Sequence, residues 1–206
     1  MVIVATGCTF TTEVVTAVPQ IPVVNVAQLP VHVVFVRQNQ HMNTTSFRPT
    51  VQQGGEPKQG DSTYEYVVDS TEAVNGAYEA AFRQLFESLS VVDAHEQVEQ
   101  LEMVDGVIEV QLLRMDVACE GLGELKLRWT WIAAAEIEVR LADAVGRPIA
   151  VHRTRNLGHY FGDANLDQAG PTRLAATEAL LNTVTTFVRE FHAQPGVQNW
   201  LQRRNE

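Results

Sequence analysis

The sequence predicts an α+β fold in which an antiparallel or mixed sheet of about four to five strands carries two main helices on one face. Two segments, 74–89 and 171–191, repeat apolar residues at helical spacing, and strand-like runs fill residues 107–152 between them. The length of 206 residues and the hydrophobic fraction of 45% suffice for one large domain with a buried core. We therefore expect a single domain over residues 31–206.

The predicted domain begins with a strand at residues 30–38, where β-branched residues alternate or run together. The preceding residues 8–30 are poor in charge and contain Pro19, Pro22 and Pro30, a spacing that excludes a helix. Proline at this density is tolerated in extended coil or in an edge strand. We expect residues 8–30 to form an extended tether.

Residues 39–63 have no apolar periodicity and are rich in Gln, Asn, Thr and Gly. A structureless segment of this length inside a compact domain is usually either mobile or functional. We expect a long loop here and take it as the main candidate for a contact surface. Phe47 and Arg48 are its candidate partner-binding residues.

The first predicted helix follows Asp69 and Ser70, two candidate caps, and Glu72 stands three residues after Asp69. Its apolar residues fall on one face, so we expect the helix to pack on the sheet. These residues are Val74, Ala77, Tyr78, Ala81, Phe82, Leu85, Phe86 and Leu89. A short strand at 90–92 and a polar connector at 95–103 are expected to follow.

Three strand-like runs form a predicted meander from residue 107 to 152, with a GLG break at 121–123 and a DAVG hairpin turn at 143–146. In the middle run, charged and apolar residues alternate from position 136 to 141. This period of two is typical of an antiparallel strand that has one face in water.

Trp129 and Trp131 stand two residues apart on the same predicted strand, so their side chains share one face. Aromatic residues in this arrangement are most often packed in a core or against a sheet face. A contact surface for a partner or a saccharide is the alternative, and both residues are therefore candidate partner-binding residues.

The second predicted helix begins near Gly170, with Pro171 in its first turn, and Pro195 and Gly196 end it. Its apolar side consists of Leu174, Leu180, Leu181, Val184, Phe187, Val188 and Phe191. A last turn after Gly196 is expected to pack its apolar residues against the body of the domain.

The formal net charge of −10 argues against a nucleic-acid partner, because such binding needs a basic surface that releases counterions. No stretch approaches the roughly 18 apolar residues of a membrane span. Any membrane attachment is therefore expected through the N-terminus or through a partner. The sequence leaves open whether the protein forms a homo-oligomer.

Metal binding is not predicted. No two of the six histidines stand four residues apart, and the two cysteines form no CxxC motif. Asp163, Asn165 and Asp167 have the first spacings of a calcium loop, but Gln168 and Leu174 occupy the positions of the required Gly and Glu. We expect neither a metal nor another cofactor.

Enzymatic activity is not predicted either, because the sequence contains no GxSxG nucleophile elbow and no phosphate-binding glycine motif. The polar stretch between His152 and His159 is the one candidate for a hydrolytic site. A solvated strand end and loop is the simpler interpretation, since nothing there pairs a base with a nucleophile.

The first eight residues, MVIVATGC, form a short apolar run that ends in small residues and a cysteine. This run resembles the end of a bacterial lipoprotein signal peptide, whose processing needs small side chains such as Thr6 and Gly7 before the cysteine. A complete signal is longer. Either the reading frame starts upstream and residues 1–7 are the remnant of a signal peptide, or Met1 is authentic and residues 2–5 form a strand or a terminus.

In the lipoprotein interpretation, Cys8 is the lipid attachment site, and the thiol of Cys119 has no partner to oxidise with. In a secreted protein without a lipid the two cysteines could form a disulfide, and in a reducing compartment both would remain thiols. The first interpretation is preferred because it also explains the residues before Cys8.

Several features in series resemble the small periplasmic lipoproteins typified by YajG and the lipopolysaccharide-assembly lipoprotein LptE, with a body similar to the N-terminal domain of TolB and to LpoB. They are the cysteine with its Pro-rich follower, the helix TEAVNGAYEAAFRQLFESLSVV, the strand DGVIEVQLLRMDV, the hairpin WIAAAEIEVRLADAVGRPIAVHRTRN and the closing PGVQNWL. The similarity extends over nearly the whole chain from Cys8.

The resemblance implies a non-enzymatic protein, anchored by acyl chains such as palmitate to the periplasmic face of the bacterial outer membrane. Thr9, after the cysteine, is not the Asp that resembles an inner-membrane retention signal. The implied role is that of an assembly or accessory factor, with subunits of a cell-envelope complex as protein partners. The alternative is a periplasmic binding module for an amphipathic small molecule or lipid.

Overall fold

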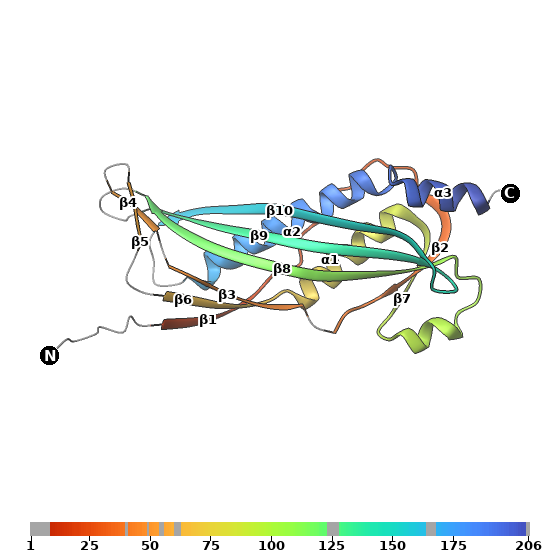
Figure 1. The fold of residues 1–206 in the computed structure, drawn as a ribbon, viewed down its shortest axis with the longest axis horizontal. Coiled ribbons are helices and arrows are strands. Elements are labelled where there is room, and N and C mark those ends of the chain that lie inside the picture. Colours follow the sequence, from red (N-terminus) through yellow and green to blue (C-terminus); the bar gives the residue numbers. More distant parts are fainter. Residues whose placement is uncertain are drawn as a thin grey trace.

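The computed structural model describes residues 9–39, 41–48, 50–53, 56–59, 63–122, 128–163 and 168–204. The molecule is elongated, and a long sheet runs along it beside two helices (Figure 1). The order of elements is β1 (Thr9–Val15), β2 (Leu29–Val36), β3 (Met42–Phe47), β4 (Thr50–Gln53), β5 (Glu56–Gln59), β6 (Thr63–Asp69), α1 (Thr71–Leu85), β7 (Phe86–Val92), η1 (His95–Gln100), β8 (Gly106–Leu122), β9 (Arg128–Asp143), β10 (Pro148–Asp163), α2 (Ala169–Phe191) and α3 (Pro195–Arg204).

The long sheet has the order β10-β9-β8-β2-β7, and a small sheet has the order β1-β6-β3. The β8-β9-β10 meander is antiparallel, whereas β2 is parallel to both β8 and β7. In the small sheet β1 is parallel and β3 antiparallel to β6. The structure thus confirms the predicted α+β fold with a mixed sheet and two main helices.

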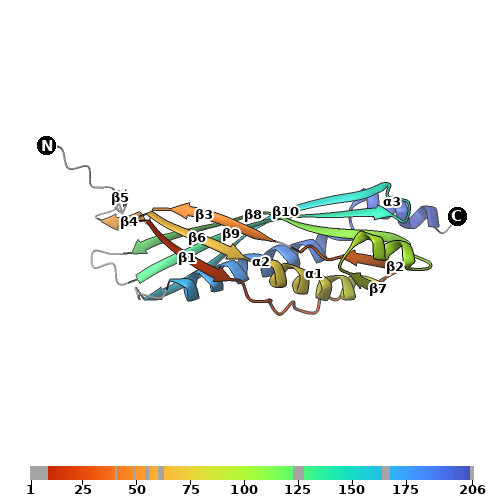
Figure 2. The same ribbon diagram turned by 90° about the horizontal axis from the view of Figure 1, so that it is seen from below.

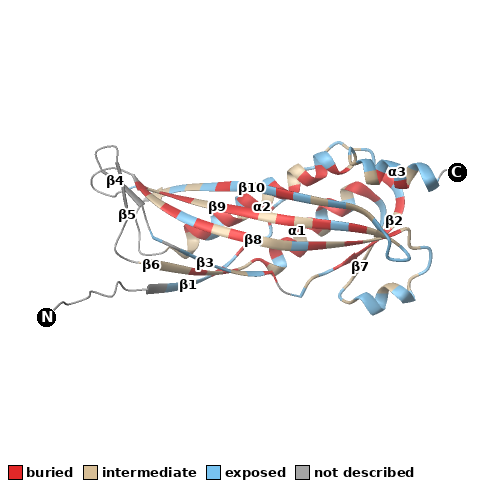
Figure 3. Ribbon diagram, in the orientation of Figure 1, coloured by how far each residue is buried: buried red, intermediate tan, exposed pale blue. Residues whose placement is uncertain are grey.

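Both main helices cover the same face of the long sheet (Figure 2). Along the meander, buried residues alternate with exposed or half-buried ones (Figure 3). In β9, Ile137, Val139 and Leu141 lie in the core, while Glu138 and Arg140 lie on the opposite face. The predicted alternation therefore identifies the outer face of the meander, opposite the face that α1 and α2 cover.

Aromatic side chains join α1, α2 and β2 in the main core. The ring of Phe82 lies 5.1 Å from that of Phe35 and 5.8 Å from that of Phe187, measured between centroids. All three residues are fully buried. Edge-to-face packing at such distances adds to the burial of the apolar surface, so these rings fix how the two helices sit on the sheet.

A second core lies under the N-terminal half of α2, where alanines let the helix approach the strands closely. Ala175, Ala176 and Ala179 pack there with residues of β1, β6, β8 and β9. At Gly158 of β10, a Cβ atom would lie only 2.1 Å from the carbonyl oxygen of Ala175. Glycine is therefore required where α2 crosses β10.

Side chains of α2 also bind the backbone at the outer edge of β10. The amide of His159 donates to Glu178 Oε2 at 2.7 Å, and Asn182 Nδ2 donates to the carbonyl oxygen of Leu157 at 2.8 Å. An open strand edge is a template for pairing with another chain. Glu178 and Asn182, one helical turn apart, occupy part of that edge.

The first helix ends earlier than its apolar pattern predicts. The predicted side-chain cap does not form: Ser70 is the N-cap residue and makes no side-chain cap hydrogen bond, while the carboxylate of Asp69 before it accepts the amide hydrogen of Thr71 at 2.9 Å. The helix ends at Leu85, however, and Phe86 and Leu89 belong to β7, where Leu89 pairs with Val33. The strand predicted at 90–92 exists but begins sooner, because pairing with β2 competes with the last helical turn.

The loop predicted at 39–63 is wrong for the described residues, which form β3, β4 and β5. β3 has the sequence MNTTSF and pairs antiparallel with β6 along its whole length. Its threonines favour a strand, but its polar composition gives no apolar alternation. Backbone pairing with β6 supplies the stabilisation that the apolar pattern does not reveal.

The segment expected to be a tether contacts the body at several points along its described part. β1 pairs with β6 from Thr9 onward, and Thr16 Oγ1 lies 2.9 Å from Ser70 Oγ. Further along, the amide of Val24 donates to Gln84 Oε1 at 2.9 Å. Residues 9–28 therefore form a strand followed by an extended segment that packs on α1.

The expected final segment is confirmed as α3, which buries Val197 and Trp200 against the body. No helix in the described part of the chain is long and apolar enough to cross a membrane.

Candidate functional site

A groove lies on the outer face of the meander, next to the β9–β10 hairpin turn. Its floor comes from side chains that share this face. Val107 and Glu109 of β8 pair with Ala142 and Arg140 of β9, and Val151 of β10 lies on the other side of Arg140. Three neighbouring strands thus present both apolar and charged side chains to the same hollow.

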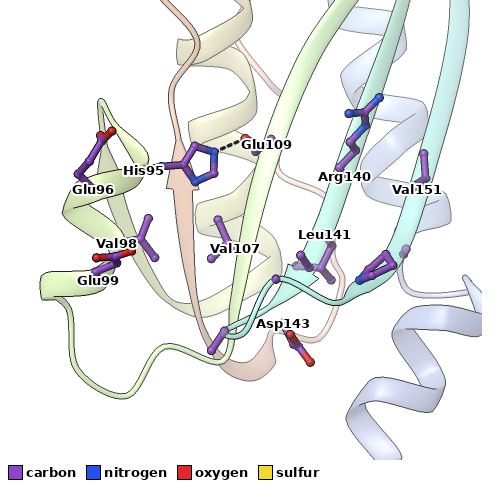
Figure 4. Close-up of a pocket in the computed structure, with 15 residues that line it drawn as sticks. His95, Glu96, Val98, Glu99, Val107, Glu109, Arg140, Leu141, Asp143 and Val151 are labelled. Carbon is purple, nitrogen blue, oxygen red and sulfur yellow. Dashed lines mark hydrogen bonds and ion pairs between the residues drawn. The ribbon is translucent and has the colours of Figure 1, made fainter.

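One wall of the groove is η1 with the segment around it, and the other is the β9–β10 hairpin turn (Figure 4). His95, Glu96, Val98 and Glu99 come from the η1 wall. The groove has a volume of about 540 Å³, which is within the usual range of binding sites for small molecules.

The hairpin wall is held by the side chain of Asp143. Its Oδ1 accepts the amide hydrogens of Val145 at 3.1 Å and of Arg147 at 2.8 Å. Gly146 has a φ of +83°, a backbone conformation that favours glycine. The predicted DAVG turn is confirmed, and its hydrogen bonds give this wall a defined shape.

The η1 wall is held mainly by polar contacts, since none of its residues is buried. His95 Nε2 lies 2.5 Å from Glu109 Oε1 on the floor (Figure 4), and the amide of Asp93 donates to Gln97 Oε1 at 3.0 Å. Few apolar contacts and exposed hydrogen bonds are typical of a segment that opens locally at low cost.

The charges around the groove are mostly negative. Glu96, Glu99, Glu109 and Asp143 line it together with one guanidinium group, that of Arg140. Arg140 Nη2 is already 2.6 Å from Glu138 Oε1, which does not line the groove. Among the described residues, Glu96 and Glu99 form no ion pair with any cation.

The structure does not bring the sequence-predicted site residues to this groove. Arg48 is exposed, and its Nε donates to Thr63 Oγ1 at 3.3 Å. Phe47 ends β3, and its side chain lies outside the described part, as does the whole of Cys8. Trp129 and Trp131 lie at the beginning of β9, at the far end of this strand from the hairpin turn.

The two tryptophans are packing residues for the most part. Trp131 is only 2% exposed and belongs to the second core, with its ring 6.2 Å from that of Tyr160. Trp129 is half-buried, with its ring 6.5 Å from that of Trp131. Burial removes Trp131 from any contact surface, as the packing interpretation of the sequence predicts.

The histidines considered for a hydrolytic site face opposite sides of the sheet. His152 turns toward the helices, where it contacts Gln194 and packs against the ring of Phe187, whereas His159 lies on the exposed outer side. The predicted loop between them is strand β10. No group of three or more His, Cys, Asp or Glu suited to a metal ion occurs in the described residues.

Sequence reasoning missed the groove because its walls come together only through the fold. The hairpin turn and the polar connector were each visible in the sequence. Their approach depends on the parallel pairing of β2 with both β7 and β8, which brings η1 beside the floor. A pattern of local propensities carries no signal for such non-consecutive pairing.

No protein-family model and no curated protein matches the chain. Among solved structures, it is similar to protein XCC0632 of Xanthomonas campestris, from the DUF330 family, with 12% identity, a TM-score of 0.48 and coverage of 94% of this chain and 98% of that one.

Lipoprotein GNA1162 of Neisseria meningitidis is 11% identical, with a TM-score of 0.36 over 80% of this chain and 100% of that one. A minor lipoprotein of Acinetobacter baumannii is 6% identical, with a TM-score of 0.35 over 84% and 96%. Likenesses of this degree assign no function to this chain.

Proposed function

We propose that this protein is a lipid-anchored periplasmic lipoprotein, acylated at Cys8, that serves without enzymatic activity as an accessory or assembly factor of a cell-envelope complex. Its partner protein binds in the groove at the β9–β10 hairpin. The residues Thr6, Gly7 and Cys8 support the anchor, and the position of the groove supports the binding role.

The observation that carries the proposal is the distance between the start of β1 and the groove. β1 begins in one half of the elongated molecule, and the β9–β10 hairpin lies at the opposite end (Figure 1). The 16 residues of β9 alone extend over about 50 Å at roughly 3.3 Å per residue. A lipid next to β1 would hold that end at the bilayer and direct the groove away from it.

The pairing of β1 with β6 supports this geometry. Because β1 pairs with β6 from Thr9, the residue directly after Cys8, the anchor is followed at once by the folded body. Several acyl chains would be needed, since a single chain binds a bilayer only marginally. Thr9 after the cysteine favours the outer membrane as the location.

A second candidate function uses the same groove for an amphipathic small molecule or lipid. Its volume of about 540 Å³ and the apolar residues Val98, Val107 and Val151 favour such a ligand. The two candidates differ in what the groove retains when the protein is isolated from its membrane.

The anchor is tested by mass spectrometry of the mature N-terminus from the native host, with the full upstream reading frame present. We expect a chain that begins at an acylated Cys8. A chain that retains the residues before an unmodified Cys8 would contradict the proposal.

The binding role is tested by isolating the protein from detergent-solubilised membranes. A stoichiometric envelope protein that is lost from a Val151→Asp variant supports the accessory role. A lipid or small molecule recovered without a protein supports the second candidate and contradicts the first.

A further inference from the structure

We infer that the groove takes a cationic amphipathic peptide segment, in which lysine or arginine is interspersed with apolar residues. This inference rests on the proposed function and specifies the chemistry of the partner. It follows from two properties of the groove that do not depend on each other, its uncompensated negative charge and its apolar floor.

The negative charge is in excess at the η1 wall. Of the charged residues that line the groove, four are carboxylates and one is a guanidinium, and Arg140 is paired with Glu138. Asp143 pairs with Arg147 at 2.7 Å, and Glu109 contacts His95. Within the described part of the chain, the carboxylates of Glu96 and Glu99 are therefore unpaired, and they can attract cationic side chains of a ligand.

The apolar contribution comes from the floor and one wall. Val107 of β8 pairs with Ala142 of β9, and Val151 of β10 lies opposite Arg140, two residues from Ala142. Val98 lines the groove from η1 (Figure 4). Val151 is 57% exposed, although it is a large apolar residue. Apolar side chains of a ligand can cover this floor, while long lysine or arginine side chains reach the acidic wall.

This combination disfavours the other ligand classes. An anionic lipid headgroup or an acidic peptide would place like charges beside Glu96 and Glu99 without a free cation in the groove. A purely apolar segment would cover the floor but would gain no attraction from these two exposed carboxylates. A segment with both kinds of side chain satisfies both parts of the groove.

Calorimetric titration of the full chain with two short peptides, one alternating lysine with valine and one alternating glutamate with valine, tests the inference. We expect the lysine–valine peptide to bind and the glutamate–valine peptide not to bind. Binding is expected to weaken severalfold between low salt and about 0.15 M salt, because exposed charges are screened over roughly 8 Å at that concentration.

Matched variants assign the binding to the groove. A Glu96→Lys/Glu99→Lys variant is expected to weaken the lysine–valine peptide by about tenfold or more, since two attractions become repulsions. A Glu13→Lys/Glu87→Lys variant makes the same change of net charge at exposed positions outside the groove and is expected to leave binding within about twofold.

The apolar floor has its own pair of variants. Val151→Ser is expected to weaken binding severalfold, whereas Val23→Ser, at a residue that is 90% exposed in the segment packed on α1, is expected to have no effect. Equal binding of the two peptides, or equal loss in both charge variants, overturns the inference. Binding of a cationic detergent but not of the lysine–valine peptide also overturns it, in favour of a small amphiphile.

The inference and the proposed function fail separately. If the peptide does not bind but an envelope protein is recovered from membranes in a Val151-dependent way, the inferred chemistry of the partner is wrong and the accessory role is supported. If the peptide binds as described but no envelope protein is recovered, the proposed function is wrong, while the preference of the groove for cationic amphipathic peptides is supported.

Discussion

His95 Nε2 lies 2.5 Å from Glu109 Oε1 and so joins η1 to the floor strand β8. His95 belongs to a wall of the groove that has no buried residues, and Glu109 belongs to the floor, on a long strand of the sheet. This contact is a direct polar link between a locally weak segment and the meander. The shape of the groove therefore depends on it.

A His95→Ala variant is expected to loosen the η1 wall without unfolding the protein. An exposed pair of this kind contributes at most about 1 kcal/mol, so the melting temperature should change little. Hydrogen–deuterium exchange should become faster in residues 93–105 and remain unchanged in β9. A His159→Ala variant, at an exposed histidine outside the groove, should alter neither region.

Replacing Gly158 with alanine is expected to destabilise the fold. The added Cβ would approach the backbone of α2 at 2.1 Å, too close for adjustment by side chains alone. Overpacking of this kind costs about 1–3 kcal/mol or more, which denaturant unfolding would detect. Gly121→Ala is the control, because its nearest neighbours are side-chain atoms of Trp129 at 3.5 Å. Equal losses in the two variants would contradict the packing of α2 on β10.

The aromatic core is tested by Phe82→Ala. Phe82 is fully buried between α2 and the sheet, so the free energy of unfolding should fall by about 3–5 kcal/mol. Phe161→Ala removes the same atoms from a side chain that is 70% exposed and should cost less than about 0.5 kcal/mol. Similar costs at the two positions would disprove the assignment of the core.

Buried histidines should make the protein less stable in acid. Burial lowers the pKa of His41 and the pKa of His152 from their usual value. The unfolded chain, with a histidine pKa of about 6.5, then binds more protons than the native state. The contribution of these histidines to the free energy of unfolding is therefore fully present above about pH 6.5. It is lost as the pH falls toward their lower pKa in the folded state.

The His41→Gln variant is expected to lose less stability than the wild type between about pH 7 and pH 5, as measured by melting temperature. His41 Nδ1 accepts the amide hydrogen of Leu112 at 3.3 Å, a role that the glutamine carbonyl oxygen can take. His159→Gln changes an exposed histidine and should leave the pH dependence as it is. An unchanged pH dependence in His41→Gln would show that His41 is not responsible.

The sequence predicts the meander, the hairpin turn and the helices well, because each depends on local signals. In β9 the alternation of Glu138 and Arg140 with apolar neighbours gives both the strand and its two faces. The turn from Asp69 to Thr71 and the turn at Asp143 are formed by hydrogen bonds to nearby backbone amides. Signals of this kind are contained within a few residues.

The parts that the sequence does not predict depend on distant partners. β3 is stabilised by backbone pairing with β6, and the strand that begins at Phe86 by pairing with β2. Residues 9–28 look like a tether until their partners on β6 and α1 are known. The groove has the same origin, since η1 and the floor residue Arg140 lie far apart in the chain.

Site-specific photo-crosslinking in intact cells of the native host shows directly whether the groove holds an envelope protein. A benzoyl-phenylalanine placed at position 151, in the groove, is compared with one at position 23, on the helix side of the sheet. We predict that position 151 captures one envelope protein in high yield while the lipoprotein stays in the membrane fraction, and that position 23 does not. Capture of the same protein from both positions, or of no protein from position 151, would contradict the account.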